Sequence, residues 1–301
     1  MRTQSKYLLL TILAAIGWGF SGTCGEHFFK DYGTNGEWLT SVRLLTSGTL
    51  LIVINLLTGH KKELLGILKN KKDFIQLLLF SVLGMMGVQY TYLTAIAYTN
   101  SGTATVLQYI GPAFVLLYIC LSTRRLPHWR EFVSLIGISL GVFLIATHGN
   151  INTLVISQLG LFWGISSAVF LAIHDILPIR IIQRWGSLPV TAWAMVFGGI
   201  MLSLITRPFD YSPVISLDTV LTFSGLILIG TVFGFTAFLT GVSHIGPVKA
   251  SIVCCIEPIA ASLFSAVWMH THFTVHDILG MIIILVAISV LTIAPEKKSL
   301  L

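Results

Sequence analysis

Charged residues are scarce in this sequence. Only 10% of its 301 residues are Asp, Glu, Lys or Arg, whereas a soluble globular domain carries roughly 25%. Hydrophobic residues make up 55% of the chain and its mean hydropathy is +0.88. So few charges cannot cover the water-facing surface of a soluble domain of this length, and the composition excludes that class.

Several chemical motifs are also missing. The sequence has no G-x-x-x-x-G-K-[ST] pattern, so we do not expect ATP to drive the protein directly. It has no H-E-x-x-H zinc-protease pattern and no C-x-x-C pair. The four cysteines lie inside or at the edge of apolar segments, which is typical of small buried hydrophobes. We therefore expect neither an enzyme nor a resident cofactor or metal.

One cluster near the C-terminus could suggest a metal site. It contains His270, His272, His276 and Asp277, and imidazole and carboxylate are both common zinc ligands. Their spacing matches no recognised ligand pattern, and histidine is also at home at a membrane surface. The sequence does not decide whether these histidines bind metal.

The apolar residues form ten blocks, each about as long as a helix that crosses a ~30 Å hydrocarbon core. Lipid cannot hydrogen-bond the backbone, so such blocks must be helices. The alternating pattern of a transmembrane barrel is absent. The predicted helices span residues 7–25, 37–57, 74–98, 102–121, 129–148, 157–177, 188–206, 217–241, 248–269 and 275–294. We predict an all-α, multi-pass membrane protein with ten transmembrane helices.

The positions of lysine and arginine predict the orientation. With a cytoplasmic N-terminus, 15 of the 18 basic residues fall on the cytoplasmic side. Lys30 and Arg207 fall outside, and Arg43 lies within a helix. We therefore expect a cell (inner or plasma) membrane protein with both termini in the cytoplasm. The net charge of +6 then reflects topology and affinity for anionic lipid, not a nucleic-acid partner.

The sequence repeats itself at an offset of about 146 residues. The matches include Gly17-Trp18-Gly19 with Phe162-Trp163-Gly164, Ala104, Thr105 and Pro112 with Ala250, Ser251 and Pro258, and Glu131 with Asp277. Each half holds five helices, an odd number, so the second half enters the membrane from the opposite side. We predict two inverted five-helix repeats, residues 1–149 and 150–301. Two halves of one shape can exchange conformations, which suits a transporter.

These motifs resemble the EamA group of the drug/metabolite transporter superfamily. The resemblance covers both repeats and rests on Ala15–Gly19, Arg43, Thr105 through Gly111-Pro112, and Ala250-Ser251 followed by Glu257-Pro258. It implies two EamA-type repeats that carry a small metabolite, more often outward. Within the family the chain is most similar to bacterial inner-membrane carboxylate, amino-acid and amine carriers.

The chain departs from the family at one point. The family often has Gly-Glu at the ends of the fourth and ninth helices. Residues 122–125 here read Ser-Thr-Arg-Arg, and residues 269–272 read Met-His-Thr-His. No role of those glutamates can be carried over to this chain.

Two ionisable residues lie inside predicted helices, where a charge costs at least ~2.5 kcal/mol and usually faces a cavity or a partner. Arg43 could clamp a substrate carboxylate through two hydrogen bonds; the alternative is snorkelling or tethering helix ends. Glu257 could carry a proton or meet an amine; the alternatives are a structural pair with Arg43 and a satisfied hydrogen-bonded group.

Other residues could line the same path. Trp18 and Trp163 occupy equivalent mid-helix positions beside glycines, where an indole can form a cavity wall or pack helices together. Gln89, Tyr92 and Gln108 could line the path or hydrogen-bond between helices. Pro112 and Pro258 are predicted to break their helices and free backbone carbonyls. His174 and Asp175 are expected to be a solvated pair at a helix end.

We expect a secondary transporter that exports an amino acid or a carboxylate by alternating access. The alternatives are efflux of hydrophobic cations or drugs, and a lipid-scrambling or structural membrane protein without a defined solute site. The expected partners are a small-molecule substrate and the lipid bilayer. Protons, a counter-substrate and a homodimer are left open.

Overall fold

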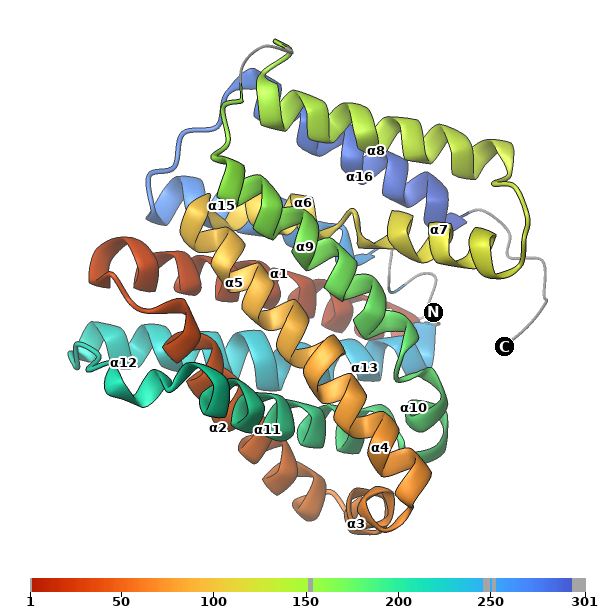
Figure 1. Ribbon diagram of the computed structural model, residues 1–301, viewed down its shortest axis with the longest axis vertical. Helices are drawn as coiled ribbons and strands as arrows, with labels where there is room; N and C mark the ends of the chain where they lie inside the picture. Colours follow the sequence, from red (N-terminus) through yellow and green to blue (C-terminus); the bar gives the residue numbers. More distant parts are fainter. Residues whose placement is uncertain (1, 151–153, 246–249, 251–252, 294–301) are drawn as a thin grey trace.

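The computed structural model describes residues 2–150, 154–245, 250 and 253–293 (Figure 1). The described part of the first half contains α1 (Arg2–Tyr32), α2 (Gly36–Leu57), α3 (Lys61–Lys69), α4 (Lys71–Leu79), η1 (Phe80–Met86), α5 (Gly87–Tyr98), α6 (Ser101–Gln108), α7 (Gly111–Ser122) and α8 (Trp129–Thr147). That of the second contains α9 (Gln158–Ile176), α10 (Ile179–Trp185), α11 (Ser187–Thr206), η2 (Pro208–Asp210), α12 (Leu217–Ser224), η3 (Gly225–Phe233), α13 (Gly234–Ile245), α15 (Ile256–Trp268) and α16 (Val275–Ile293).

The ten predicted transmembrane helices are confirmed. Eight spans in the described chain are long and apolar enough to cross a membrane, and two shorter apolar helices, α15 and α16, complete the set. The third span joins α4, η1 and α5, the fourth joins α6 and α7, and the eighth joins α12, η3 and most of α13. The first part of the predicted ninth helix includes residues that lie outside the described ones.

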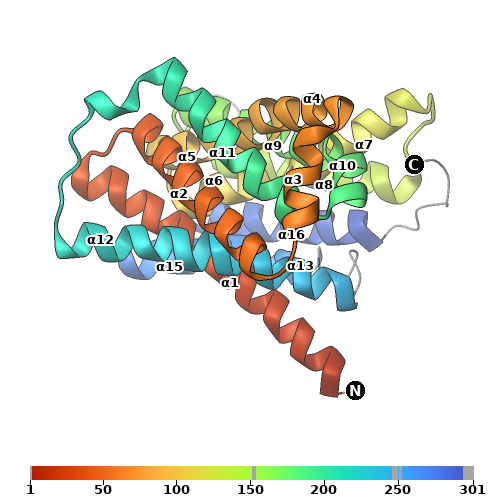
Figure 2. The same ribbon diagram turned by 90° about the horizontal axis from the view of Figure 1, so that it is seen from below.

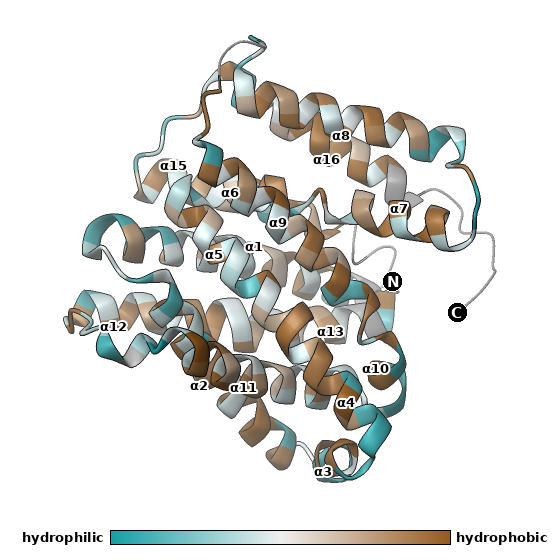
Figure 3. Ribbon diagram, viewed as in Figure 1, coloured by the Kyte–Doolittle hydropathy of each residue, from teal (hydrophilic) through white to brown (hydrophobic). Residues whose placement is uncertain are grey.

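Hydropathy colouring shows that apolar residues predominate along most of these helices (Figure 3). Large apolar side chains such as Phe132 and Ile136 on α8, and Ile282 and Val286 on α16, are exposed. In water such surfaces would be costly, whereas in a bilayer they face acyl chains of the same polarity. The outer surface therefore suits lipid, as the composition predicts.

Side-chain oxygens cap several of the helices. Asn35 accepts from the backbone N–H of Glu37 (2.7 Å) at the start of α2. The repeat-equivalent acids Glu131 and Asp277 each accept a backbone hydrogen bond at the start of a helix. Glu131 accepts from the N–H of His128 (2.7 Å), and Asp277 from that of Thr274 (2.8 Å). These bonds satisfy donors that a helix start leaves without partners, and they fix where α8 and α16 begin.

The lysine-rich stretch 58–73, which connects the second and third predicted helices, contains the short helix α3. Leu64 and Ile67 share one face of α3 and are buried. The Trp193 indole N–H also donates to the Leu64 carbonyl (2.8 Å). Apolar side chains three residues apart gave the signal for this amphipathic helix, which lies between two membrane spans.

The two halves interlock through equivalent contacts (Figures 1 and 2). The first-repeat helix α1 packs against η3 and α13, and its counterpart α9 packs against η1 and α5. The helices α2 and α11, which are counterparts, pack against each other, as do α8 and α16. This exchange of partners is the arrangement expected of inverted repeats.

The third and eighth spans share a rare irregularity. Each contains a π-helical segment, η1 in one and η3 in the other, and the two overlap at the repeat offset. In η3 the Thr231 hydroxyl donates to the Leu226 carbonyl five residues back (3.2 Å). Segments of π-helix are frequent at functional sites, and both of these contribute to the centre of the bundle.

Candidate functional site

Two helix breaks meet at the centre of the protein. The fourth span breaks at Tyr109 and Ile110, between α6 and α7, and the ninth has a turn at Cys255, before α15. Pro112 lies two residues after the first break and Pro258 three residues after the second, each in the first turn of the helix that follows. Proline has no N–H, so each leaves the carbonyl four residues earlier without its helical donor. For Pro258 that carbonyl belongs to Cys254.

A cavity of about 520 Å³ lies beside these breaks. Of the residues predicted to form a site, seven line it: Trp18, Arg43, Gln89, Tyr92, Gln108, Pro112 and Glu257. They come from α1, α2, α5, α6, α7 and α15, and so from both repeats. The structure therefore brings most of the predicted site residues to one place.

Arg43 is buried, with 6% of its surface exposed, and lines the cavity from α2. Its Nη2 donates to the Ser21 hydroxyl at 3.3 Å and its Nε to the Thr231 hydroxyl at 3.5 Å, both long contacts. Its Nη1 has no hydrogen-bond partner. The guanidinium therefore keeps a free donor beside the cavity.

Glu257 lies in the first turn of α15, at the broken end of the helix. The Tyr109 hydroxyl is 2.9 Å from its Oε2 and 2.6 Å from the carbonyl oxygen of Cys254. Tyr109 also lines the cavity, although the sequence interpretation did not select it. A helix start carries a partial positive charge that favours an anion, which suits a carboxylate at this position.

Arg43 and Glu257 form no ion pair with each other, and no described carboxylate pairs with Arg43. The structure therefore does not contain the structural Arg43–Glu257 ion pair that was one alternative. One cavity presents two groups of opposite charge that do not neutralise each other by contact.

An aromatic wall adjoins these charges. Trp18 lies edge-on to Phe235, at 5.5 Å between ring centroids, and 5.1 Å from Phe238. All three line the cavity, and the Trp18 indole N–H has no partner. The Tyr92 hydroxyl instead bonds the Thr105 hydroxyl (2.8 Å), between α5 and α6. The site thus combines apolar surface with at least two free N–H donors.

Trp163 and Pro258 are not among the residues that line the cavity. Trp163 packs edge-on against Tyr90, at 5.7 Å between ring centroids. Pro258 is buried at the start of α15. Trp18 and Trp163 occupy equivalent positions in the two repeats, but different side chains surround them.

The cavity extends toward one side of the bundle. Its lining includes His174 and Asp175, which pair at 3.1 Å near the end of α9, and Ser187 at the start of α11. The first turn of α1 and the last turn of α16 lie on this side as well (Figure 1). In the predicted orientation this is the cytoplasmic side.

The opposite end is closed by a cluster around Glu26, which is fully buried. Its carboxylate accepts from the Ser101 N–H (2.9 Å), the Ser265 hydroxyl (2.7 Å), the Thr271 hydroxyl (3.1 Å) and Lys30 Nζ (2.6 Å). These donors belong to α6, α15, the chain after α15, and α1 itself. Glu26 therefore connects both repeats at the predicted outer end.

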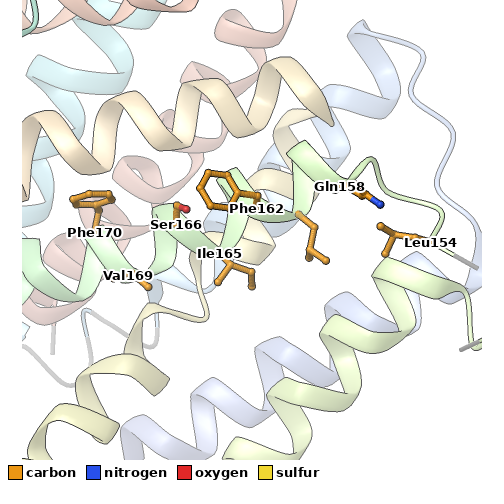
Figure 4. Close-up of a pocket in the computed structure, with 8 residues that line it drawn as sticks. Leu154, Gln158, Phe162, Ile165, Ser166, Val169 and Phe170 are labelled. Atoms are coloured by element: carbon orange, nitrogen blue, oxygen red, sulfur yellow. The ribbon is translucent and has the colours of Figure 1, made fainter. Parts of the chain in front are cut away.

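A second hollow, of about 480 Å³, follows one face of α9 (Figure 4). Phe162, Ile165, Val169 and Phe170 lie along it, and its lining carries no charged residue. Leu154 and Gln158 close one end. An apolar groove without charge suits a lipid chain better than a polar solute, so we place the solute site in the central cavity.

Two other features do not form sites in the described chain. His276 stacks on His148, which contacts Asp277 at 3.0 Å, and no group of three metal ligands occurs among the described residues. Residues 137–141 read G-I-S-L-G, the spacing of a hydrolase nucleophile elbow, but they lie mid-way along α8. Such an elbow requires a strand-to-helix turn. Instead, Gly141 packs so closely on α16 that a Cβ there would lie 2.4 Å from Ile284.

Two five-helix repeats, two central helix breaks and a cavity lined by both repeats are features of a membrane-transporter fold. The EamA-like transporter family matches the chain twice, over residues 5–147 and 158–293. The chain belongs to this family.

Relatives cover almost the whole chain. It is 36% identical over 299 residues to the uncharacterized inner membrane transporter YicL of Salmonella typhimurium, covering 99% of both chains. It is 23% identical to an uncharacterized transporter of Archaeoglobus fulgidus, covering 95% of this chain and 98% of the other. A solved crystal structure of 16% identity covers 95% of this chain and 96% of its own, with a TM-score of 0.64, and so shares the fold.

Proposed function

We propose that this chain is an inner-membrane secondary transporter that exports a small metabolite of the amino-acid or carboxylate class by alternating access. The observation that carries the substrate class is that a guanidinium with a free donor, Arg43, and a carboxyl group, Glu257, line one cavity without forming an ion pair with each other. The inner-membrane location is supported by the similarity to YicL, which is an inner membrane transporter.

The energetics of Arg43 favour a carboxylate ligand. A guanidinium within the membrane costs at least ~2.5 kcal/mol unless something compensates it. Its two hydroxyl contacts, at 3.3 and 3.5 Å, are too long to do so fully. A carboxylate could accept two charge-assisted hydrogen bonds from neighbouring N–H groups of the guanidinium. An amino group on the same solute could then reach Glu257.

Alternating access is supported by the shape of the site. The cavity extends toward the predicted cytoplasmic side, and the Glu26 cluster closes the other end. Export requires that a solute enter from the cytoplasm, and the conformation described offers an approach from there. Exchange of shape between the repeats would open the outer end.

The alternatives fit less well. For efflux of hydrophobic cations, Glu257 and the aromatic wall suffice, but the buried charge of Arg43 would repel the substrate. A lipid-scrambling protein has no need of a deep guanidinium with a free donor. Saturable, substrate-specific flux in proteoliposomes separates a carrier from a scramblase.

The test compares three ligand classes on purified protein. Amino acids, the matching amines and the matching carboxylic acids are screened by thermal shift, since a ligand that binds the folded state raises its stability. Arg43→Lys keeps the positive charge but loses the pair of N–H groups that could bind both oxygens of a carboxylate. Loss of one charge-assisted bond, about 1.5–3 kcal/mol, should weaken carboxylate binding roughly 10- to 150-fold. Amine binding should not change.

Arg130→Lys, on the exposed start of α8, is the matched control and should behave as wild type. Equal weakening for amines and carboxylates in Arg43→Lys, or normal transport in Arg43→Gln, would contradict the proposal. Either result would identify Arg43 as a structural tether and favour cation efflux.

A further inference from the structure

The contact between the two helix breaks raises a question of proton counting. The Tyr109 hydroxyl has one proton, yet two acceptors lie within hydrogen-bonding distance of it. They are the Cys254 carbonyl at 2.6 Å and Glu257 Oε2 at 2.9 Å. Tyr109 belongs to the break of the first repeat, and both acceptors belong to the break of the second.

The Cys254 carbonyl depends on this donor. Pro258, four residues later, has no N–H, so the usual helical bond to that carbonyl cannot form. An unpaired carbonyl within the membrane costs several kcal/mol by the same physics that forces membrane spans to be helical. The shorter of the two Tyr109 contacts is the one to this carbonyl.

When Glu257 is protonated, every group in this chain of contacts is satisfied. The Glu257 hydroxyl donates to the Tyr109 oxygen, and the Tyr109 hydroxyl donates to the Cys254 carbonyl. When Glu257 is ionised, it can only accept. The Tyr109 proton then turns to the carboxylate, because a charge-assisted bond is stronger than a neutral one. The Cys254 carbonyl is left without its donor.

We propose that Tyr109 is a positioning residue that couples the protonation of Glu257 to the backbone at the break before α15. This inference rests on the proposed function, in which Glu257 lines the solute cavity. Loss of the proton to water in the cavity rotates the Tyr109 hydroxyl and releases the Cys254 carbonyl. The broken helix thereby loosens where a conformational exchange would have to move it.

Other ionisable groups surround Glu257 and are held constant in the test. Arg43 on α2 and Tyr92 on α5 line the same cavity, and Cys254 and Cys255 adjoin it in sequence. His174 and Asp175 on α9 line the cavity further toward its predicted cytoplasmic end. The Tyr109 hydroxyl, 2.9 Å from Oε2, contacts the Glu257 carboxyl directly.

The sequence provides a unique label for this experiment. Cys254-Cys255 is the one pair of adjacent cysteines in the chain. Protein labelled with cysteine carrying ¹³C at the carbonyl and ¹⁵N at the amide therefore has a ¹³C–¹⁵N bond between two labelled residues only there. Its carbonyl chemical shift reports whether the Cys254 carbonyl accepts a hydrogen bond. The probe is pH alone, applied to the full chain in detergent micelles.

We expect the wild-type signal to move between two positions as pH is raised. In Glu257→Gln the neutral amide can still donate to Tyr109, so the signal should stay at the bonded position at every pH. In Tyr109→Phe it should stay at the unbonded position. Tyr118→Phe, an exposed tyrosine on α7, should titrate like wild type.

Two results would overturn the proposal. One is a wild-type signal that does not move with pH, and the other is a Tyr109→Phe signal that titrates as wild type does. Titration that persists in Glu257→Gln would also contradict the proposal, because it would show that another group controls the Cys254 carbonyl. That result would leave the Arg43 test of the proposed function unaffected.

Discussion

Replacing Glu26 should lower the free energy of unfolding by an amount that follows from its hydrogen bonds. Its carboxylate has no exposed surface and accepts four hydrogen bonds. Glu26→Ala leaves the Ser101 N–H buried without an acceptor, and a backbone donor cannot reverse its role. Lys30 is 41% exposed and can turn into water. The unsatisfied Ser101 N–H alone should cost about 1–3 kcal/mol of unfolding free energy, and the loss of the other three bonds and of the side-chain volume adds to this cost.

Glu26→Gln should cost much less. The amide can direct its oxygen at the Ser101 N–H and its NH₂ at the Thr271 hydroxyl, which can accept. What is lost is the Lys30 pair, worth about 0–1 kcal/mol at a surface, and the charge assistance of the remaining bonds. We therefore expect a loss of about 1–2 kcal/mol. Asp210→Ala, an exposed acid in η2 near the same end, is the control and should stay within about 0.5 kcal/mol of wild type.

The assay is reversible unfolding in mixed micelles, followed by helical circular dichroism. The expected order of stability is wild type equal to Asp210→Ala, then Glu26→Gln, then Glu26→Ala. If Glu26→Ala unfolded with the wild-type free energy, or if Glu26→Gln were the less stable of the two, the hydrogen-bond argument would be refuted.

Two further predictions concern packing and topology. A Cβ at Gly19 would lie 2.7 Å from the backbone nitrogen of Ala261, so Gly19→Ala should displace α15 and cost about 1–3 kcal/mol of unfolding free energy in the same assay. The control is Gly36→Ala, which should cost little because its Cβ would meet Phe29 at an ordinary 3.7 Å. Equal effects of the two substitutions would contradict the packing argument. Reporter fusions after Gly149 should report an external location and fusions after Leu301 a cytoplasmic one, and an external C-terminus would contradict the predicted orientation.

The number of helices and their inverted repeat could be predicted because each depends on local composition. A block of apolar residues must be helical in lipid, whatever its neighbours are. The repeat followed from matches such as Pro112 with Pro258, which the structure places at equivalent breaks. The helix α3 was missed because its lysines masked the short apolar face of Leu64 and Ile67.

The site could be predicted only in part. Charges and aromatic residues within helices, such as Arg43, Glu257 and Trp18, could be selected because their presence in lipid is costly or unusual. Tyr109 was missed because a tyrosine within an apolar block is unremarkable by composition. Its significance depends on a contact with Cys254, 145 positions along the chain. Contacts of that range are not visible in a single sequence.

Glu26 was missed for a related reason. It lies near the end of the first span, where an acid is usually solvated. Its burial depends on Ser101 and Ser265, which come from other spans. The difference between Trp18 and Trp163 shows the same limit, since equivalent sequence positions have different neighbours.

The Glu26 cluster also makes the two repeats unequal. At the offset of 145 that aligns Trp18 with Trp163, Glu26 corresponds to Leu171, whose side chain cannot accept a hydrogen bond. In the proposed alternating-access cycle, the closed outer end has a carboxylate-centred cluster that the repeat symmetry does not supply at the opposite end. Every ~1.4 kcal/mol of such a difference changes the ratio of the two conformations about tenfold. On that proposal, the Glu26 cluster favours a resting carrier whose cavity faces the end where α1 begins.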